Sequence, residues 1–261
     1  MTLGIIGGTN AALELEGSRE RTVETRHGRV DVVVGELRGT PVAFVRRHGA
    51  RHERLSSAVD HRSNIAALAE LGAEAIVATT VCGVIDPNVA VARALLFDDL
   101  YFPDNRLPDG SPCTFFAQPS DPQRGHLIWR GPFSPWVREG LQAAAALSGV
   151  ELTTRGTYAY ALGPRFNTRS EIAAFSAAGA IAVSQTAGPE AVLAAELEIP
   201  YALLGFGVDY ANGVQPQPTP VEVLDANIAR SKAVFSAVLG EFADGFEAHS
   251  FDTGFVYRME G

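Results

Sequence analysis

The sequence has few of the features that mark secreted, membrane-spanning or zinc-binding proteins. Its two cysteines, Cys82 and Cys113, are too few for a disulfide framework, and neither shows the Cys/His spacing of a zinc site. No apolar run reaches the roughly 18 residues that a membrane-spanning helix requires. The apolar start lacks the basic flank of a signal peptide and runs directly into a glycine turn, which favours a strand. We therefore expect a cytoplasmic protein with free thiols and no bound metal.

Basic residues are also scarce. The chain has 21 Lys and Arg against 30 Asp and Glu, which gives a formal net charge of −9. Because no basic stripe is present to neutralise phosphate backbones or lipid headgroups, we expect no nucleic-acid partner and no membrane partner. A small anionic ligand would need a local cationic pocket instead.

Short β-branched runs alternate with stretches rich in Ala and Leu along the 261 residues. This alternation is typical of an α/β fold, and a chain of this length often forms one domain. We predict a single domain, residues 1–261, in which helices flank a twisted, largely parallel or mixed central sheet. Strands are predicted at 3–6, 30–37, 42–46, 75–80, 94–98, 157–161, 180–183 and 201–207. Helices are predicted at 60–72, 135–148, 169–178, 189–198 and 220–243, the last with a start capped by Thr219, Pro220 and Glu222.

Two segments that follow predicted strands carry donors suited to an anion. Gly7-Gly8-Thr9 lets the backbone approach a ligand, and its amides and the Thr9 hydroxyl can donate, although a tight turn without a ligand gives the same sequence. In Arg47-His48 the guanidinium fork can grip phosphate and the histidine can add a donor, with a structural salt bridge as the alternative. Each segment alone is compatible with a purely structural role.

Other strand ends carry further polar or aromatic side chains. Ligands of open α/β sheets lie beyond the carboxyl ends of strands, where Thr80 and the segment Ser184-Gln185-Thr186 are expected. Phe166 can stack on a flat heterocycle and Asn167 can pair with its edge, unless the phenylalanine is a core residue of a helix-entry turn. Asp209 ends another strand, where its carboxyl group can accept a hydrogen bond from a base or donate a proton.

Taken in order, these segments resemble the trimeric purine nucleoside and methylthioadenosine phosphorylases. The resemblance extends over nearly the whole chain, in the segments IIGGT, RHG with His52 after it, NIAAL, TTVCG, GHLIWRGPFSP, GPRFNTRSE, SQTAGPE and GVDY. It implies the nucleoside phosphorylase fold and a homotrimer with sites at subunit interfaces. It also implies that the ligands are a purine nucleoside and phosphate, with phosphate as co-substrate and no cofactor.

The resemblance further implies a role for each matching residue. Phosphate would be held by Thr9, Arg47, His48, Thr80 and Thr186; the purine would meet Phe166, Asn167 and Asp209; the sugar and its 5′ substituent would meet Gln185, Val221, Leu224 and, from a neighbouring subunit, His126. Asp209 and His48 are the expected catalytic residues. In this family an aspartate at the place of Asp209 accompanies 6-aminopurines. The expected reaction is therefore phosphorolysis of a 6-aminopurine nucleoside with a 5′ substituent, such as methylthioadenosine or an analogue, to free base and sugar 1-phosphate.

Two residues depart from the family pattern. Gln185 stands where a methionine usually packs against the ribose, so its amide is expected to contact something polar, such as an altered sugar. Ala211 stands where methylthioadenosine phosphorylases tend to carry a second aspartate. Two other functions stay open: a nucleosidase in which water replaces phosphate, and a nucleoside-binding protein without turnover. The set of Arg47, His48 and threonines favours the phosphorylase, because a hydrolase has no need of so many anion donors.

Overall fold

A computed structural model describes residues 1–9, 13–118 and 120–258. Within these ranges, one large sheet contains β1 (Thr2–Gly7), β2 (Glu16–Thr25), β3 (Gly28–Leu37), β4 (Thr40–Arg46), β5 (Ala73–Val84), β6 (Ala94–Leu96), β7 (Asp99–Tyr101), β9 (Leu152–Thr153), β10 (Thr157–Tyr160), β11 (Ala180–Ser184) and β12 (Tyr201–Tyr210). A separate two-stranded ribbon pairs β8 (Gly125–Trp129) with β13 (Gly254–Arg258). The helices are η1 (Ser56–Ala58, a 3₁₀ turn), α1 (His61–Glu70), α2 (Pro135–Leu147), α3 (Arg169–Ala177), α4 (Ala187–Glu196) and α5 (Val221–Ala243).

The large sheet is mixed, and β5 organises it. β1 lies between β4 and β5 and runs parallel to both, and β12 runs parallel to β5. β11 pairs antiparallel with the carboxyl end of β5, and β10 and β7 then continue parallel to β11. At 12 residues β5 is long enough to contact β1 with one half and β11 with the other. The change of strand direction therefore falls beside the last residues of β5.

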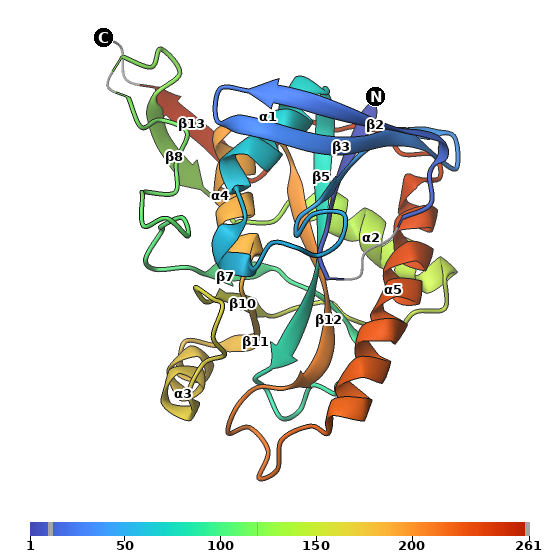
Figure 1. Cartoon of the computed structure of the whole chain (residues 1–261), viewed down its shortest axis with the longest axis vertical. Coiled ribbons are helices and arrows are strands. Elements are labelled where there is room, and N and C mark those ends of the chain that lie inside the picture. The colour runs from blue at the N-terminus through green and yellow to red at the C-terminus, as the bar shows by residue number, and fades with distance from the viewer. Residues whose placement is uncertain (10–12, 119, 259–261) are drawn as a thin grey trace.

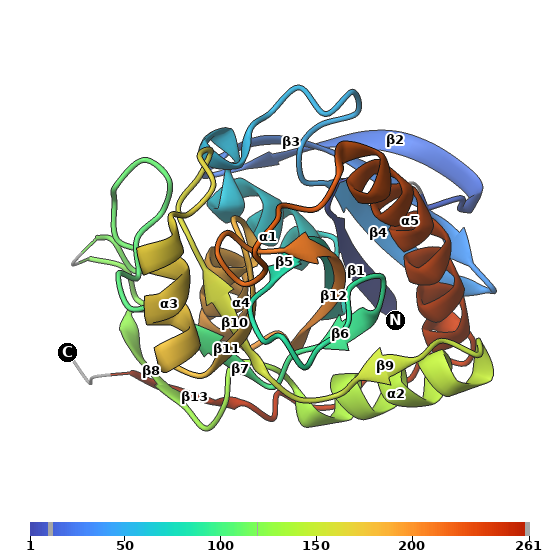
Figure 2. The same ribbon diagram turned by 90° about the horizontal axis from the view of Figure 1, so that it is seen from below.

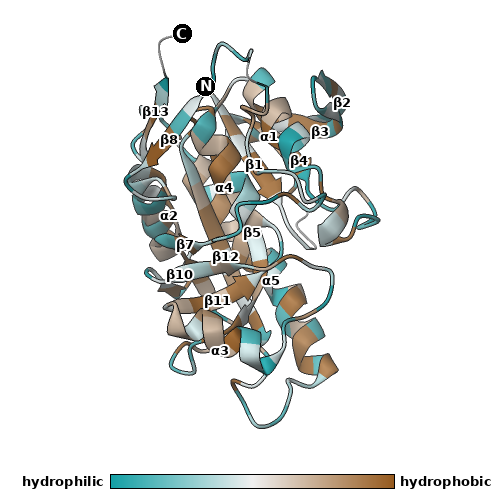
Figure 3. Ribbon diagram, turned by 90° about the vertical axis from the view of Figure 1, so that its left-hand side faces the viewer, coloured by the Kyte–Doolittle hydropathy of each residue, from teal (hydrophilic) through white to brown (hydrophobic). Residues whose placement is uncertain are grey.

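Helices cover both faces of the sheet. α1 and α4 pack together on one face, and α2 and α5 pack together on the other (Figures 1 and 2). Within β1, Leu3 and Ile5 share a core cluster with Val137 of α2, whereas Ile6 lies in the cluster of Ile65 from α1. α5 alternates between hydrophobic and hydrophilic stretches (Figure 3), as expected of a helix with one face on the sheet and the other in water.

The fold class predicted from the sequence is confirmed, and each predicted strand and helix is present. Five strands were not predicted: β2, β7, β8, β9 and β13. β2 is exposed at all but two of its ten residues, so it carries no apolar signal and forms by pairing with β3. Among the described residues, no helix combines the length and the apolar character needed to cross a membrane.

The predicted cap of the last helix is wrong. Pro220 is the residue that precedes the first helical residue, with an extended φ and ψ of −57° and 145°, and no side chain caps this end. The helix therefore begins one residue later than expected. Glu222 is then the second helical residue rather than the third, so it cannot reach back as a capping-box carboxylate.

Candidate active site

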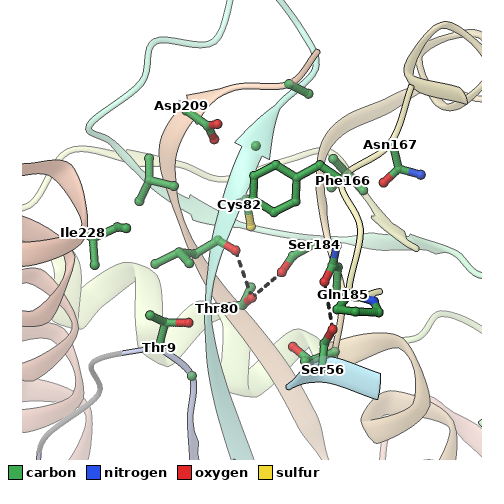
Figure 4. A pocket seen from close by; sticks show the side chains of 18 of the residues that line it. Thr9, Ser56, Thr80, Cys82, Phe166, Asn167, Ser184, Gln185, Asp209 and Ile228 are labelled. Atoms are coloured by element: carbon green, nitrogen blue, oxygen red, sulfur yellow. Dashed lines mark hydrogen bonds between the residues drawn. The ribbon is translucent and has the colours of Figure 1, made fainter. Parts of the chain in front are cut away.

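A cavity of about 330 Å³ lies where the carboxyl ends of β1, β4, β5, β11 and β12 meet (Figure 4). The segment between β10 and α3 and the first turns of α5 complete its wall. The polar residues that line it are Thr9, Arg47, His48, His52, Ser56, Thr80, Asn167, Ser184, Gln185, Thr186, Asp209 and Asn212. Polar side chains from five strand ends thus converge on one space, as expected for a mixed α/β sheet.

Arg47 places a buried positive charge in this cavity. Its side chain is fully buried, and Nε and Nη2 donate to the two carboxylate oxygens of Glu190 at 2.5 and 2.8 Å. Nη1 donates to the carbonyl oxygen of Thr79 at 2.8 Å. These three bonds leave two of the five guanidinium N–H donors for a ligand. The structural salt bridge considered from the sequence is therefore present, and Arg47 lines the cavity as well.

Glu190, which orients Arg47, belongs to the first turn of α4. It is fully buried and also accepts a hydrogen bond from the hydroxyl of Tyr201 at 3.1 Å. Burial alone would raise its pKa, but the charge and hydrogen bonds of Arg47 hold the pKa of Glu190 below its ordinary value. An ionised carboxylate at this place fixes the plane of the guanidinium.

Three threonines and a serine place hydroxyl groups in the same cavity. The hydroxyl oxygens of Thr80 and Ser184 lie 2.9 Å apart. Thr186 is the residue before α4 and makes no capping bond with its side chain, and it lines the cavity. The amide of Ala187, the first of α4, donates to the hydroxyl of Tyr158 at 3.4 Å. Thr9 follows β1. With Arg47 and His48, the residues expected to bind phosphate all line one cavity.

His48 is neutral in this environment. Burial first, and then the charge of Arg47, lower the pKa of His48 to about 4. Its Nδ1 lies 2.9 Å from the carbonyl oxygen of Arg54. Because a carbonyl can only accept, Nδ1 carries the proton and Nε2 is an acceptor. Without a ligand, the Nε2 of His48 is therefore suited to accept a hydrogen bond from a protonated phosphate oxygen.

Asp209 lies near the end of β12 at the opposite side of the cavity (Figure 4). Burial raises the pKa of Asp209 to about 6. No hydrogen bond to its carboxylate is found within the described ranges, so the group is open to a ligand. A carboxylate with this pKa is mostly ionised at neutral pH and acts as an acceptor.

Phe166 and Asn167 lie in the segment that leads into α3. The ring of Phe166 is 72% exposed, which rules out a core residue and leaves its face open for stacking. The amide of Asn167 donates to Glu171 at 3.3 Å, and Glu171 forms a capping box with Thr168. Part of the hydrogen-bonding capacity of Asn167 is thus used by the helix start.

The residues expected around the sugar divide into two groups. Gln185 and Leu224 line the cavity, and the amide of Gln185 is bonded to Ser56 and to the carbonyl of Arg165. Val221, the first residue of α5, does not line it in this chain: it is 65% exposed and lies one turn away from Leu224. His126 lies on β8 and lines a different cavity of this chain, so only a neighbouring copy could bring it to the site.

The site thus has two unlike ends, which define the class of ligand. Arg47 and the hydroxyl groups suit an anion, whereas Asp209 and the open ring of Phe166 suit a flat heterocycle with donors on its edge. A molecule that joins these two parts, or a pair of molecules that react between them, would fill the cavity.

Comparisons with known proteins agree with this class. The sequence matches the Phosphorylase superfamily over residues 2–244. It is 34% identical to the 6-oxopurine nucleoside phosphorylase of Pyrococcus furiosus, over 91% of this chain and 90% of that protein. It is 30% identical to the S-methyl-5′-thioadenosine phosphorylase of Chloroflexus aurantiacus, over 96% and 88% respectively. The fold matches a methylthioadenosine phosphorylase from Schistosoma mansoni in complex with adenine with a TM-score of 0.83, at 25% identity over 93% of this chain and 90% of that one.

The chain therefore belongs to the purine nucleoside and methylthioadenosine phosphorylase family, and it is an enzyme of the pentosyltransferase class. The family and the enzyme class predicted from the sequence are confirmed.

Sequence reasoning missed two residues that shape the site. A buried arginine at a strand end requires a carboxylate partner, but nothing in the sequence indicates that Glu190, 143 positions away, provides it. Ser56 gave no signal either, because its bond to Gln185 spans 129 positions.

Proposed function

We propose that this enzyme splits a purine nucleoside by phosphorolysis, giving the free base and a sugar 1-phosphate, with a 6-aminopurine nucleoside such as methylthioadenosine or an analogue as substrate. The proposal rests on one observation, which is that the two ends of a single cavity carry different chemical groups. Arg47 with the hydroxyl groups forms an anion site at one end, and the carboxylate of Asp209, which has no hydrogen-bond partner among the described residues, faces a base site at the other. Phosphate is the co-substrate, and no cofactor is required.

Phosphate binding falls to Arg47, Thr9, Thr80, Thr186 and His48. The two unused N–H groups of Arg47 and the hydroxyl groups donate to phosphate oxygens, while Nε2 of His48 accepts from a protonated one. These contacts hold a phosphate oxygen beside C1′ of the sugar. A water nucleophile needs no such set of donors, which favours phosphorolysis over hydrolysis.

The chemical step exchanges one bond at C1′ for another. The C1′–N9 bond breaks through an oxocarbenium-like sugar, its electron pair leaves with the purine, and a phosphate oxygen forms the new bond to C1′. Solvent supplies a proton to N7 of the departing base. The ionised carboxylate of Asp209 accepts a hydrogen bond from N7–H and stabilises the charge that grows on the base.

Base preference follows from the charge of Asp209. An ionised carboxylate accepts from the exocyclic amino group of a 6-aminopurine, whereas it repels the oxygen of a 6-oxopurine. Phe166 stacks on the ring and Asn167 meets its edge. The 34% identity to a 6-oxopurine nucleoside phosphorylase favours inosine-type substrates as the second candidate.

We also infer that the enzyme is a homotrimer in which His126 of one subunit approaches the 5′ end of the sugar bound by the next. His126 shares the exposed face of the β8–β13 ribbon with Ile128, Phe255 and Tyr257, which are 45%, 44% and 56% exposed. An aromatic and aliphatic face of this kind is costly in water and supports an interface.

The deciding experiment measures base release from methylthioadenosine, adenosine and inosine, each with and without phosphate. Adenine release that requires phosphate is the expected result. Release without phosphate identifies a nucleosidase instead. A thermal shift on nucleoside binding with no product identifies a binding protein without turnover, and hypoxanthine release that exceeds adenine release assigns the second candidate.

A further inference from the structure

The side-chain amide of Gln185 joins two segments that are far apart in the sequence. Its Oε1 accepts a hydrogen bond from Ser56 Oγ at 2.8 Å (Figure 4), and its Nε2 donates to the carbonyl oxygen of Arg165 at 2.9 Å. Ser56 begins η1 and is buried, and Arg165 lies in the connection between β10 and α3. One amide therefore bonds to two walls of the cavity at once.

These segments meet without room for another atom. A Cβ added at Gly163 would collide with both Gln185 Oε1 and Ser56 Oγ. The backbone between β10 and α3 therefore packs directly on the hydrogen-bonded pair, and a side chain at this position would displace Gln185 and Ser56.

The two joined walls carry different parts of the site. Ser56 belongs to the connection that starts with Arg47 and His48, on the phosphate side. Arg165 immediately precedes Phe166 and Asn167, on the purine side. Gln185 itself immediately precedes Thr186. A sugar that joins a purine to phosphate must lie between these walls.

The purine-side segment has few other restraints toward the phosphate side. The ring of Phe166 is 72% exposed, so packing holds its backbone weakly. Thr168 and Glu171 tie the end of the segment to α3, and Asn212 donates to the carbonyl of Asn167 at 2.7 Å. In the part of the chain that the structure describes, the amide of Gln185 provides the hydrogen-bonded link to the Ser56 side.

We propose that Gln185 is a positioning residue that sets the distance between the phosphate donors and the Phe166 segment, and with it the sugar that can bridge them. This inference rests on the phosphorolysis proposed above. It differs from the expectation that the amide contacts a polar group of the substrate: its oxygen and its nitrogen each have a protein partner, and the variants below test whether the remaining N–H also meets the substrate. Without the link, the nucleoside must order the Phe166 segment when it binds, which weakens binding.

Kinetics of four single variants test the role. Gln185→Met keeps the length of the side chain and removes both hydrogen bonds. Gln185→Glu keeps the acceptor for Ser56 and loses the donor to Arg165. Ser56→Ala removes only the hydroxyl that donates to Gln185. We expect the nucleoside KM to rise roughly five- to tenfold in Gln185→Met and less in the other two, with kcat and the phosphate KM within about twofold of wild type. Gln142→Met on α2 makes the same chemical change away from the cavity and is the matched control.

The double variant Gln185→Met/Ser56→Ala separates a link from a direct contact with the sugar. If the amide acts through Ser56, the double variant is about as impaired as Gln185→Met alone. Two results would overturn the proposal: KM increases of the two single variants that multiply in the double variant, or a loss of binding confined to nucleosides that carry a particular sugar hydroxyl. Either would show that Gln185 contacts the substrate directly.

Hydrogen exchange of the ligand-free protein tests the link independently of turnover. Amides of residues 162–168 should exchange faster in Gln185→Met and in Ser56→Ala than in wild type or Gln142→Met. Unchanged exchange refutes the link even if phosphorolysis is found. Faster exchange together with an absence of phosphorolysis in the wild type refutes the proposed function and leaves the link standing.

Discussion

Glu190 is fully buried and Asp209 is half-buried, and the two carboxylates lie in opposite electrostatic environments. Glu190 accepts two hydrogen bonds from Arg47, which hold its pKa below the ordinary value. Asp209 has no such partner within the described residues, and burial raises its pKa to about 6. The carboxylate of Glu190 therefore orients a cation, whereas that of Asp209 is suited to the base contact proposed above.

Asp209→Asn should reverse the preference for the base. An amide can donate to the oxygen of a 6-oxopurine, whereas the ionised carboxylate can only accept. We expect the ratio of kcat/KM for inosine to that for adenosine to rise roughly 100-fold, mainly through loss of adenosine turnover. Steady-state kinetics with both nucleosides at pH 7.5 measures this ratio. Unchanged adenosine turnover would show that Asp209 does not contact the base.

The wild type should also lose adenosine turnover as the pH falls. Because the pKa of Asp209 is raised, the carboxylate is ionised above about pH 6 and becomes protonated below it. The kcat/KM for adenosine should therefore fall about tenfold for each pH unit below that value. The Asp209→Asn variant is the control, because its pH profile should lack this limb.

Glu190→Gln should damage both stability and phosphate binding. The substitution leaves Arg47 buried without a counter-charge, which costs about 3–5 kcal/mol and lowers Tm by roughly 10 °C. The phosphate KM should rise about tenfold or more, because the guanidinium loses the fork that orients it. Glu20→Gln removes the exposed partner of Arg46 and should change stability by under about 1 kcal/mol. A Glu190→Gln variant with the Tm and phosphate KM of the wild type would contradict this account.

At the scale of elements, the turn after β1 depends on a close backbone approach. The amide of Gly8 donates to Thr79 Oγ1 at 3.2 Å, and a Cβ at Gly8 would lie 2.6 Å from the carbonyl oxygen of Thr79 and 2.9 Å from Nη1 of Arg47. One of these atoms belongs to the backbone and the other to a buried guanidinium, so displacing either would disturb closely packed structure.

Gly8→Ala should therefore weaken phosphate binding. We expect the phosphate KM to rise about tenfold, since the added methyl group displaces Arg47 or the turn. Gly131→Ala is the control: nothing lies within 4 Å of a Cβ there, so activity and Tm should stay close to wild type. Equal phosphate KM values for the two variants would show that the turn does not shape the anion site.

The sequence predicted the elements that bury apolar residues on both sides. β1, β5 and β12 are almost wholly buried, so each contains an apolar run that is easy to recognise in the sequence. β2, β8 and β13 were not predicted, because their residues are largely polar or exposed and their strand form depends on a partner strand. Local patterns cannot supply that partner.

The same limit applies to the site. Strand-end residues such as Thr80 and Asp209 could be placed from the sequence, since the ends of parallel strands gather at one edge. The tautomer of His48 could not be predicted, because it depends on the carbonyl of Arg54, which only the folded loop brings within 2.9 Å. The bonds of Glu190 and Gln185 depend equally on contacts over more than a hundred positions.

At the scale of the whole molecule, the β8–β13 ribbon presents an apolar face to solvent. Ile128 lies directly opposite Phe255, and His126 lies opposite Tyr257. All four side chains are exposed, whereas Val256 on the other face of the ribbon is buried. Directly opposed aromatic and aliphatic side chains of this kind gain most when a second surface covers them.

Phe255→Arg tests whether this face joins the subunits. A charge at the centre of an apolar interface is desolvated without a partner, so we expect the trimer to dissociate. The mass measured by sedimentation velocity should fall from about three times the 27.7 kDa chain mass to the mass of a single chain. The KM for methylthioadenosine should rise, because the contact proposed between His126 of one subunit and the sugar bound by the next would be lost. Leu147→Arg, at a 77% exposed position of α2, is the control and should leave the particle mass and the KM for methylthioadenosine unchanged. A monomeric wild type would refute the trimer, whereas a trimeric Phe255→Arg variant would place the interface on another face.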